Sequence, residues 1–265
     1  MNNTVWVFGD SFSWDHKIRW ANSKSHILKN LQDLPTDKYI IEHLDGLPFD
    51  SWGEIVANNL NMNYENHGAY QQDGRINNWL PPSNSNNAMI NLVSEYSNKF
   101  KKGDHVFLGF TDICRFEMPN NMGYGSQVSP HRGMTSERTE LQTQLLFIRD
   151  DNQKYYFLEM MQKLKVLETL SEVVGFNLWY WTHCKTTNPI THFDEMNTSL
   201  IKDAVSKYWI LHQAFPIYTT YTEFIETLGG GNIAWETNGV INDGHMGKIG
   251  NKVHGEFISE YLKNL

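Results

Sequence analysis

The chain alternates short apolar runs with longer segments in which apolar residues recur every three or four positions. Buried strands are expected at residues 4–8, 105–110 and 176–181, with a further short strand over 62–66. The helical spacing predicts helices over residues 52–60, 88–100, 155–174 and 248–262. Strands that alternate with helices predict parallel crossover units and a sheet covered by helices on both faces.

Two glycines are expected to mark the ends of these elements. Gly175 follows the long helix at the position where a left-handed C-cap belongs. Gly103 and the adjacent Asp104 are interpreted as a turn before the third strand.

Length, charge and cysteine content limit the classes of function. A chain of 265 residues is a size at which α/β folds are often one domain, so we expect a single domain over residues 1–265. Its 22 basic and 30 acidic residues give a net charge of −8, which argues against a nucleic-acid or anionic-membrane surface. Two cysteines are too few for a disulfide framework. No apolar run approaches the roughly 20 residues that cross a bilayer, and no signal-peptide pattern opens the chain, so we expect a protein that is cytoplasmic as synthesised.

Two long stretches, residues 14–50 and 113–150, fit the alternation poorly because both are polar and irregular. Loops of this length in a compact domain are usually functional or disordered. Both leave from the same edge of the predicted sheet. They are therefore interpreted either as insertions that form walls or a lid over a pocket, or as surface decoration.

Side chains with catalytic chemistry gather where the predicted strands end, which is where ligands bind in parallel α/β sheets. The first strand leads into residues 9–11 (GDS), the third ends in residues 109–112 (GFTD), and residues 243–245 (DGH) precede the last helix. A serine needs an adjacent base to act as a nucleophile, and the base needs an orienting group. Each motif alone is also ordinary turn chemistry, but together they supply a serine, a histidine and an aspartate.

These stretches resemble the sequence blocks of the SGNH, or GDSL-type, hydrolases. Residues 8–13 (FGDSFS) are similar to the block that carries the nucleophile, and residues 242–250 (NDGHMGKIG) to the block that carries the other two triad residues. Residues 66–71 (NHGAYQ) and 109–112 (GFTD) are similar to the second and third blocks. The resemblance implies the flavodoxin-like SGNH hydrolase fold, a three-layer α/β/α sandwich of about five parallel strands.

The resemblance also implies roles for particular residues. Ser11 would be the nucleophile of an ester hydrolase, His245 its base, and Asp243 the group that orients the base. The oxyanion would be bound by the main-chain N–H of Ser11, by a main-chain N–H near Gln71 and by the Thr111 hydroxyl. No metal and no organic cofactor is required, and the rate should rise with pH as His245 loses its proton.

Several positions depart from the family pattern. Asp243 lies two residues before His245, whereas most members have a spacing of three. Thr111 stands where the family has an asparagine, and its hydroxyl is a shorter and more freely rotating donor. Loss of one oxyanion donor raises a reaction barrier by about 3–4 kcal/mol, so the enzyme is expected to be slow or differently built. Gln71 falls at the usual glycine position of the second block. The nearby alternatives for this donor are Gly68 and Gly74.

Other residues near these motifs have more than one interpretation. Asp112 and Arg115 follow the third strand and are expected to line the substrate pocket, although Arg115 and Glu117 could equally form a surface ion pair. Four histidines could together bind a metal, but the spacing of these candidate ligands is not that of a metal motif, so no metal site is predicted. The candidate ligands are His183, His192, His245 and His254.

The family includes lipases, thioesterases and carbohydrate O-deacetylases. Because the chain has no long apolar lid segment and has polar, aromatic-rich loops, the preferred substrate is a small-molecule or glycan ester with an acetyl or other short acyl group. One alternative is a catalytically weak or inactive protein of this fold that binds a glycan or serves a structural role, for example in a phage virion. Another is a metal-dependent hydrolase, which a chelator would inactivate. The oligomeric state stays open.

Overall fold

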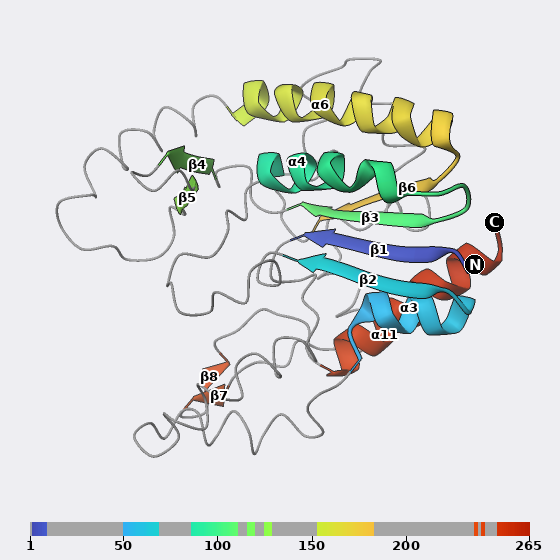
Figure 1. Cartoon of the computed structure of the whole chain (residues 1–265). Coiled ribbons are helices and arrows are strands. Elements are labelled where there is room, and N and C mark those ends of the chain that lie inside the picture. The colour runs from blue at the N-terminus through green and yellow to red at the C-terminus, as the bar shows by residue number, and fades with distance from the viewer. Residues whose placement is uncertain are drawn as a thin grey trace, which may run out of the picture.

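The computed structural model describes residues 2–9, 50–68, 86–110, 116–119, 125–128, 153–182, 236–237, 240–241 and 248–265. Within these residues, four parallel strands form the main sheet in the spatial order β2-β1-β3-β6 (Figure 1). The bounds are Thr4–Gly9 for β1, Asn63–Gly68 for β2, His105–Phe110 for β3 and Asn177–Thr182 for β6. The α/β class and the parallel sheet predicted from the sequence are confirmed.

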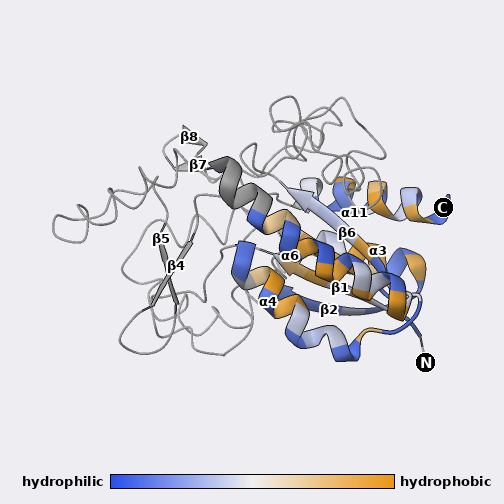
Figure 2. Cartoon of the chain, turned by 90° about the horizontal axis from the view of Figure 1, so that it is seen from above, coloured by the Kyte–Doolittle hydropathy of each residue, from blue (hydrophilic) through white to orange (hydrophobic). Residues whose placement is uncertain are grey.

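Helices cover both faces of this sheet. On one face lie α3 (Trp52–Leu60) and α11 (Lys248–Lys263), and on the other lie α4 (Asn86–Tyr96) and α6 (Gln153–Val174). Seen from above, α4 and α6 lie side by side over the strands (Figure 2). Helix α3 connects β1 to β2, whereas α4 and α6 lie in the connections from β2 to β3 and from β3 to β6. The strand order therefore reverses at β1, and the connections change face there.

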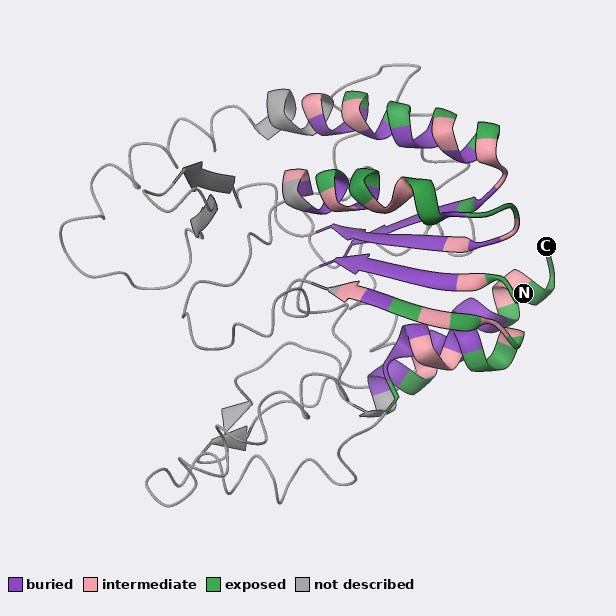
Figure 3. Cartoon of the chain, viewed as in Figure 1, coloured by how far each residue is buried: buried purple, intermediate pink, exposed green. Residues whose placement is uncertain are grey.

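Alternate side chains of the strands build two hydrophobic cores. Phe8 and Leu108 pack in the core beneath α4 and α6. Val7, Phe107 and Trp181 pack in the other core, against α3 and α11. Figure 3 shows β1, β3 and β6 buried along most of their length, whereas β2 at the edge of the described sheet has exposed residues. Burial on both faces is the reason that β1, β3 and β6 have continuous apolar sequences instead of alternating ones.

The helix predicted over residues 88–100 ends earlier than expected. Helix α4 stops at Tyr96, and a 3₁₀ helix, η2 (Ser97–Lys99), follows it. The Ser97 hydroxyl donates a hydrogen bond to the Ser94 carbonyl at 2.6 Å, and the Phe100 N–H donates to the Ser97 carbonyl at 3.3 Å. These short-range bonds tighten the last turn, as is common at the ends of α-helices.

Strand β2 is shifted relative to the prediction of residues 62–66. Helix α3 closes with Asn61 in the left-handed conformation, at φ 54°. The Met62 N–H then donates to the Ala57 carbonyl at 2.9 Å, so Met62 belongs to the helix cap and the strand begins one residue later. Pairing with β1 continues as far as Gly68.

The two predicted turn glycines meet at the end of the sheet where the strands begin. Gly175, directly after α6, has φ 86°, which confirms its predicted left-handed cap. Gly103 has the same φ, and its N–H donates to the Gly175 carbonyl at 2.9 Å. The turn before β3 and the turn before β6 are therefore joined to each other.

Part of the stretch 113–150 is regular, which corrects its interpretation as irregular. Strand β4 (Phe116–Pro119) pairs antiparallel with β5 (Gly125–Val128). Each strand has only four residues, too few to show a clear alternation, but the five residues between them include the turn formers Asn and Gly. A second short pair, β7 (Glu236–Thr237) with β8 (Val240–Ile241), was not predicted either. Of the stretch 14–50, only Asp50 lies within the described residues.

Asp104 joins the starts of three strands. Its carboxylate is buried and accepts hydrogen bonds from the Thr4 N–H at 2.9 Å, the Trp6 indole N–H at 3.0 Å and the Lys101 N–H at 3.0 Å. Its carbonyl accepts a further bond from the Asn177 N–H at 2.8 Å. A residue that the sequence identifies only as a turn former therefore connects β1, β3 and β6.

Asp104→Ala should strongly destabilise the fold because it leaves three N–H groups without their acceptor. Each unpaired buried donor costs about 1–3 kcal/mol, so we expect the free energy of unfolding to fall by about 3–5 kcal/mol. Urea unfolding followed by circular dichroism measures this change. Glu95→Ala, at an exposed position of α4, is the control and should change stability by less than about 0.5 kcal/mol. Equal unfolding midpoints for the two variants would contradict the role given to Asp104.

Candidate active site at the carboxyl edge of the sheet

All residues that the sequence assigns to the catalytic site lie outside the described residues, so their mutual contacts stay predictions. They are the triad Ser11, Asp243 and His245, the oxyanion residues Gln71 and Thr111, and the pocket residues Asp112 and Arg115. The structure does describe the chain that leads to them. Strands β1, β2 and β3 are described up to Gly9, Gly68 and Phe110, and α11 is described from Lys248.

These strand ends lie together at one edge, which we call the carboxyl edge. Gly9 at the end of β1 is paired with Gly68 at the end of β2. On the other side of β1, Phe8 is paired with Leu108 of β3, which ends two residues later. Figure 1 shows the strands pointing the same way and the first turn of α11 on the same side of the molecule. The described elements that flank the predicted site thus converge there.

A group of buried and partly buried polar side chains lies just beneath the carboxyl edge, on the face that α3 and α11 cover. The Asn66 Nδ2 donates to Tyr64 Oη at 2.6 Å, and Tyr64 Oη shares a hydrogen bond of 2.7 Å with Ser51 Oγ. Trp52 directly follows Ser51, and its main-chain N–H donates to Asn251 Oδ1 at 2.9 Å. We call Ser51, Tyr64, Asn66 and Asn251 the polar bridge. It connects the end of β2 with the first residues of α3 and α11.

Burial keeps three histidines neutral at physiological pH. Burial lowers the pKa of His67 to about 4, with a smaller contribution from the positive charge of Lys99. Burial likewise lowers the pKa of His105 to about 4, against the opposing charge of Asp104. The pKa of the fully buried His254 is lowered to about 3. These three imidazoles therefore act as packing groups, not as cations.

The surroundings of His254 are aromatic. Its ring stacks on Trp52 with centroids 4.9 Å apart and meets Trp181 edge-on at 5.4 Å. Among the described residues, no group of three or more His, Cys, Asp or Glu is placed to hold a metal ion. Of the four histidines considered as metal ligands, His254 lies in the core, and His183, His192 and His245 lie outside the described residues.

The two short antiparallel pairs lie beyond the carboxyl edge. In Figure 1, β4–β5 and β7–β8 lie past the ends of the main strands, away from the turns at the other edge. Strand β4 brings Glu117 opposite Gln127. Its suggested ion-pair partner Arg115 lies outside the described residues, so that pairing stays a prediction. Of the two pairs, only β4–β5 belongs to a predicted insertion, residues 113–150, and the choice between walls of a pocket and surface decoration stays a prediction.

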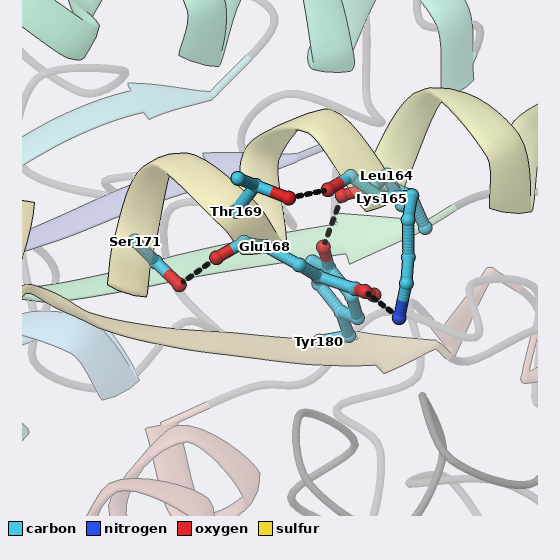
Figure 4. A network of polar contacts seen from close by, with 6 residues as sticks. All are labelled: Leu164, Lys165, Glu168, Thr169, Ser171 and Tyr180. Carbon is cyan, nitrogen blue, oxygen red and sulfur yellow. Dashed lines mark hydrogen bonds and ion pairs between the residues drawn. The ribbon is translucent and has the colours of Figure 1, made fainter. Parts of the chain in front are cut away.

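Sequence reasoning missed a buried carboxylate on α6. Glu168 is buried, and its carboxylate lies 3.1 Å from the Lys165 ammonium one turn earlier (Figure 4). The surrounding hydroxyls bond to the helix main chain: Ser171 Oγ donates to the Glu168 carbonyl at 2.7 Å, and Tyr180 Oη to the Leu164 carbonyl at 3.5 Å. The spacing of three between Lys165 and Glu168 is the sequence signal for this pair. We interpret this ion pair as structural because both of its residues belong to α6 and lie one turn apart.

Comparisons with protein-family models, with curated proteins and with solved structures gave no match. None of the described helices combines the length and the apolar character needed to cross a membrane. The case for a function therefore depends on the sequence motifs and on the geometry of the carboxyl edge.

His254 should make the fold sensitive to acid. Because its pKa is about 3 in the folded chain and 6.5 when unfolded, the unfolded state binds the proton first as pH falls. Its contribution to stability is complete above pH 6.5 and is lost progressively between pH 6.5 and 3. In His254→Phe, which keeps an aromatic ring, the slope of unfolding free energy against pH between 6 and 5 should fall by about 1 kcal/mol per pH unit. Denaturant unfolding at several pH values measures the slope, and an unchanged slope would contradict the burial of a neutral imidazole.

Proposed function

We propose that the chain is a serine-dependent ester hydrolase of the SGNH type, with Ser11 as its nucleophile. The observation that carries this proposal is the convergence of β1, β2, β3 and the start of α11 at the carboxyl edge. Each of these elements overlaps one end of a sequence block that resembles the family. The described ends of four blocks from distant parts of the sequence lie at one end of one sheet, which supports a common site.

Covalent connectivity supports a common site. Ser11 is two residues beyond the end of β1, Thr111 is one residue beyond β3, and His245 is three residues before α11. A residue spans at most about 3.6 Å. The alpha carbon of Ser11 therefore lies within about 7 Å of the end of β1, and that of Thr111 within about 4 Å of the end of β3. The alpha carbon of His245 lies within about 11 Å of the start of α11. Neighbouring strands are only about 4.8 Å apart. Ser11 and Thr111 therefore follow neighbouring strands by only one or two residues, and His245 is joined by a short length of chain to α11, whose start lies on the same side of the molecule.

The reaction would proceed through an acyl-enzyme. Ser11 Oγ attacks the ester carbonyl while His245 accepts its proton, and Asp243 holds the imidazole tautomer and stabilises the imidazolium. The main-chain N–H groups of Ser11 and Gln71 and the hydroxyl of Thr111 donate to the developing oxyanion. His245 gives its proton to the leaving alcohol. A water molecule deprotonated by the same imidazole then releases the acid and restores the serine hydroxyl.

The finer description of the fold belongs to the same proposal. The order β2-β1-β3-β6 corresponds to the first four strands of the flavodoxin-like order 2-1-3-4-5. A single domain over residues 1–265 with an SGNH fold would add a strand beyond β6, from a part of the chain outside the described residues. Its switch point, between β1 and β3, is where such sheets bind ligands.

The proposed substrate is a small-molecule or glycan ester with an acetyl or other short acyl group. The placement of β4–β5 beyond the carboxyl edge supports a wall that holds the alcohol part of the ester. Asp112 and Arg115, which follow β3 directly, would contact that part. The alternative, a catalytically weak or inactive glycan-binding or structural protein such as a virion component, is favoured by Thr111 and by the short spacing of Asp243 and His245.

Ser11→Ala should abolish hydrolysis of p-nitrophenyl acetate because the nucleophilic oxygen is removed. The wild type should also be labelled by a fluorophosphonate, with the adduct on Ser11 identified by mass spectrometry of peptides. Ser13→Ala, which changes the other serine of the same motif, is the matched control and should retain both activities. Preincubation with EDTA should leave the rate unchanged.

Other results would overturn the assignment of the nucleophile or favour a different function. Wild-type turnover by Ser11→Ala, or an adduct on another serine, would overturn the assignment of the nucleophile. Loss of activity with EDTA would indicate a metal-dependent hydrolase. A folded wild type that neither turns over nor is labelled would favour the binding or structural protein.

A further inference from the structure

Helices α3 and α11 form a close pair that runs in parallel from the carboxyl edge (Figure 1). Trp52 of α3 bonds to Asn251 of α11, and seven residues later Asn59 Nδ2 bonds to Ser259 Oγ at 3.1 Å. Between these bonds, a Cβ added to Gly255 would lie only 2.8 Å from both the Ile55 side chain and the Trp52 carbonyl. The glycine therefore permits a close approach, and the two hydrogen bonds define one longitudinal register.

The start of α3 is capped from outside the helix. The first N–H groups of a helix have no partner within it and are usually satisfied by the N-cap side chain. Ser51, the N-cap residue, makes no such bond; its hydroxyl is instead bonded to Tyr64 Oη. The Trp52 N–H bonds to the Asn251 side chain, and both residues are fully or almost fully buried. The cap of α3 is thus a residue of α11.

A buried amide at this position selects one arrangement of the two helices. Its partner Trp52 packs in an apolar core with Val56 and Ile258. Leucine has a similar volume and would pack there, but it would leave the Trp52 N–H without its acceptor. A slide of α11 by a single residue moves the helix by about 1.5 Å and breaks the bond. The hydrogen bond therefore fixes the start of α11 along its axis.

We propose that Asn251 is a positioning residue for His245, acting through its cap on α3. This inference rests on the proposed function. Asn251 is in the first turn of α11, six residues after His245. Its partner Trp52 follows Ser51, which the polar bridge ties to the end of β2. The first turn of α11, which follows the residues that carry the proposed base, is in this way tied to β2, the strand that leads to the second block.

The test compares two ends of the same helix pair by the rate of fluorophosphonate labelling of Ser11 in folded protein. Asn251→Leu should lower the labelling rate on the order of a hundredfold, the cost of a misplacement of about 1 Å. Asn251→Asp, which keeps the acceptor oxygen, should restore the rate to within about threefold of the wild type. Ser259→Ala is the matched control, since it removes a buried polar contact with α3 at the far end of α11. It should lower the melting temperature and leave the labelling rate unchanged.

The outcomes separate this inference from the proposed function. A wild type that is not labelled would contradict the proposed function itself. A labelled wild type with equal rate losses in Asn251→Leu and Ser259→Ala overturns only the positioning role, and so does failure of Asn251→Asp to restore the rate. If Asn251→Leu does not fold, Asn251→Ala replaces it, because the smaller side chain leaves room for water at the Trp52 N–H. The same hundredfold loss is then expected.

Discussion

The two-sided pairing of β1 is the constraint on which the rest of this structure depends. Strand β1 hydrogen-bonds in parallel to β2 on one side and to β3 on the other, and its side chains from Val5 to Phe8 are buried between two helical layers. A parallel neighbour requires a crossover connection, and each crossover helix needs a sheet face to cover. Helices α3 and α4 therefore lie on opposite faces. Since parallel strands all point one way, every connection after a strand starts at the carboxyl edge.

The two edges of the sheet are held by different chemistry. Where the strands begin, the buried carboxylate of Asp104 accepts hydrogen bonds from three N–H groups of β1 and of the turn before β3. Beneath the carboxyl edge, the polar bridge uses neutral hydroxyl and amide groups from β2, α3 and α11. These hydrogen bonds fix β2, α3 and α11 relative to one another.

Much of the fold was predictable from the sequence because its signals are local. Continuous apolar runs and helical spacing gave the described elements of the main sheet and its helices to within a few residues, and Gly175 marked its cap correctly. The strands β4 and β5 were missed because four residues are too few to show a period. The end of α4 was missed because serine hydroxyls, which bond to nearby carbonyls, also occur within helices.

The long-range contacts were not predictable because the sequence pattern does not encode them locally. In the sequence, Asp104 is indistinguishable from an ordinary turn residue. Its carboxylate nevertheless accepts a hydrogen bond from the start of β1, 100 residues earlier in the chain. Asn251 has no sequence feature that indicates a cap, and its partner lies 199 residues away. For the candidate site the situation is reversed. The residues were chosen from short motifs, and the structure supplies only the converging elements that lead to them.

The central claim is that distant parts of the chain bring a serine hydroxyl and an imidazole together beyond the ends of β1 and β3. A crystal structure of the full chain treated with a serine-reactive phosphonate tests it most directly. The account predicts phosphorus bonded to Ser11 Oγ, a ring nitrogen of His245 within hydrogen-bonding distance of that oxygen, and main-chain N–H groups around the phosphoryl oxygen. An unmodified Ser11, or a His245 ring too far away to exchange a proton with it, would contradict the account.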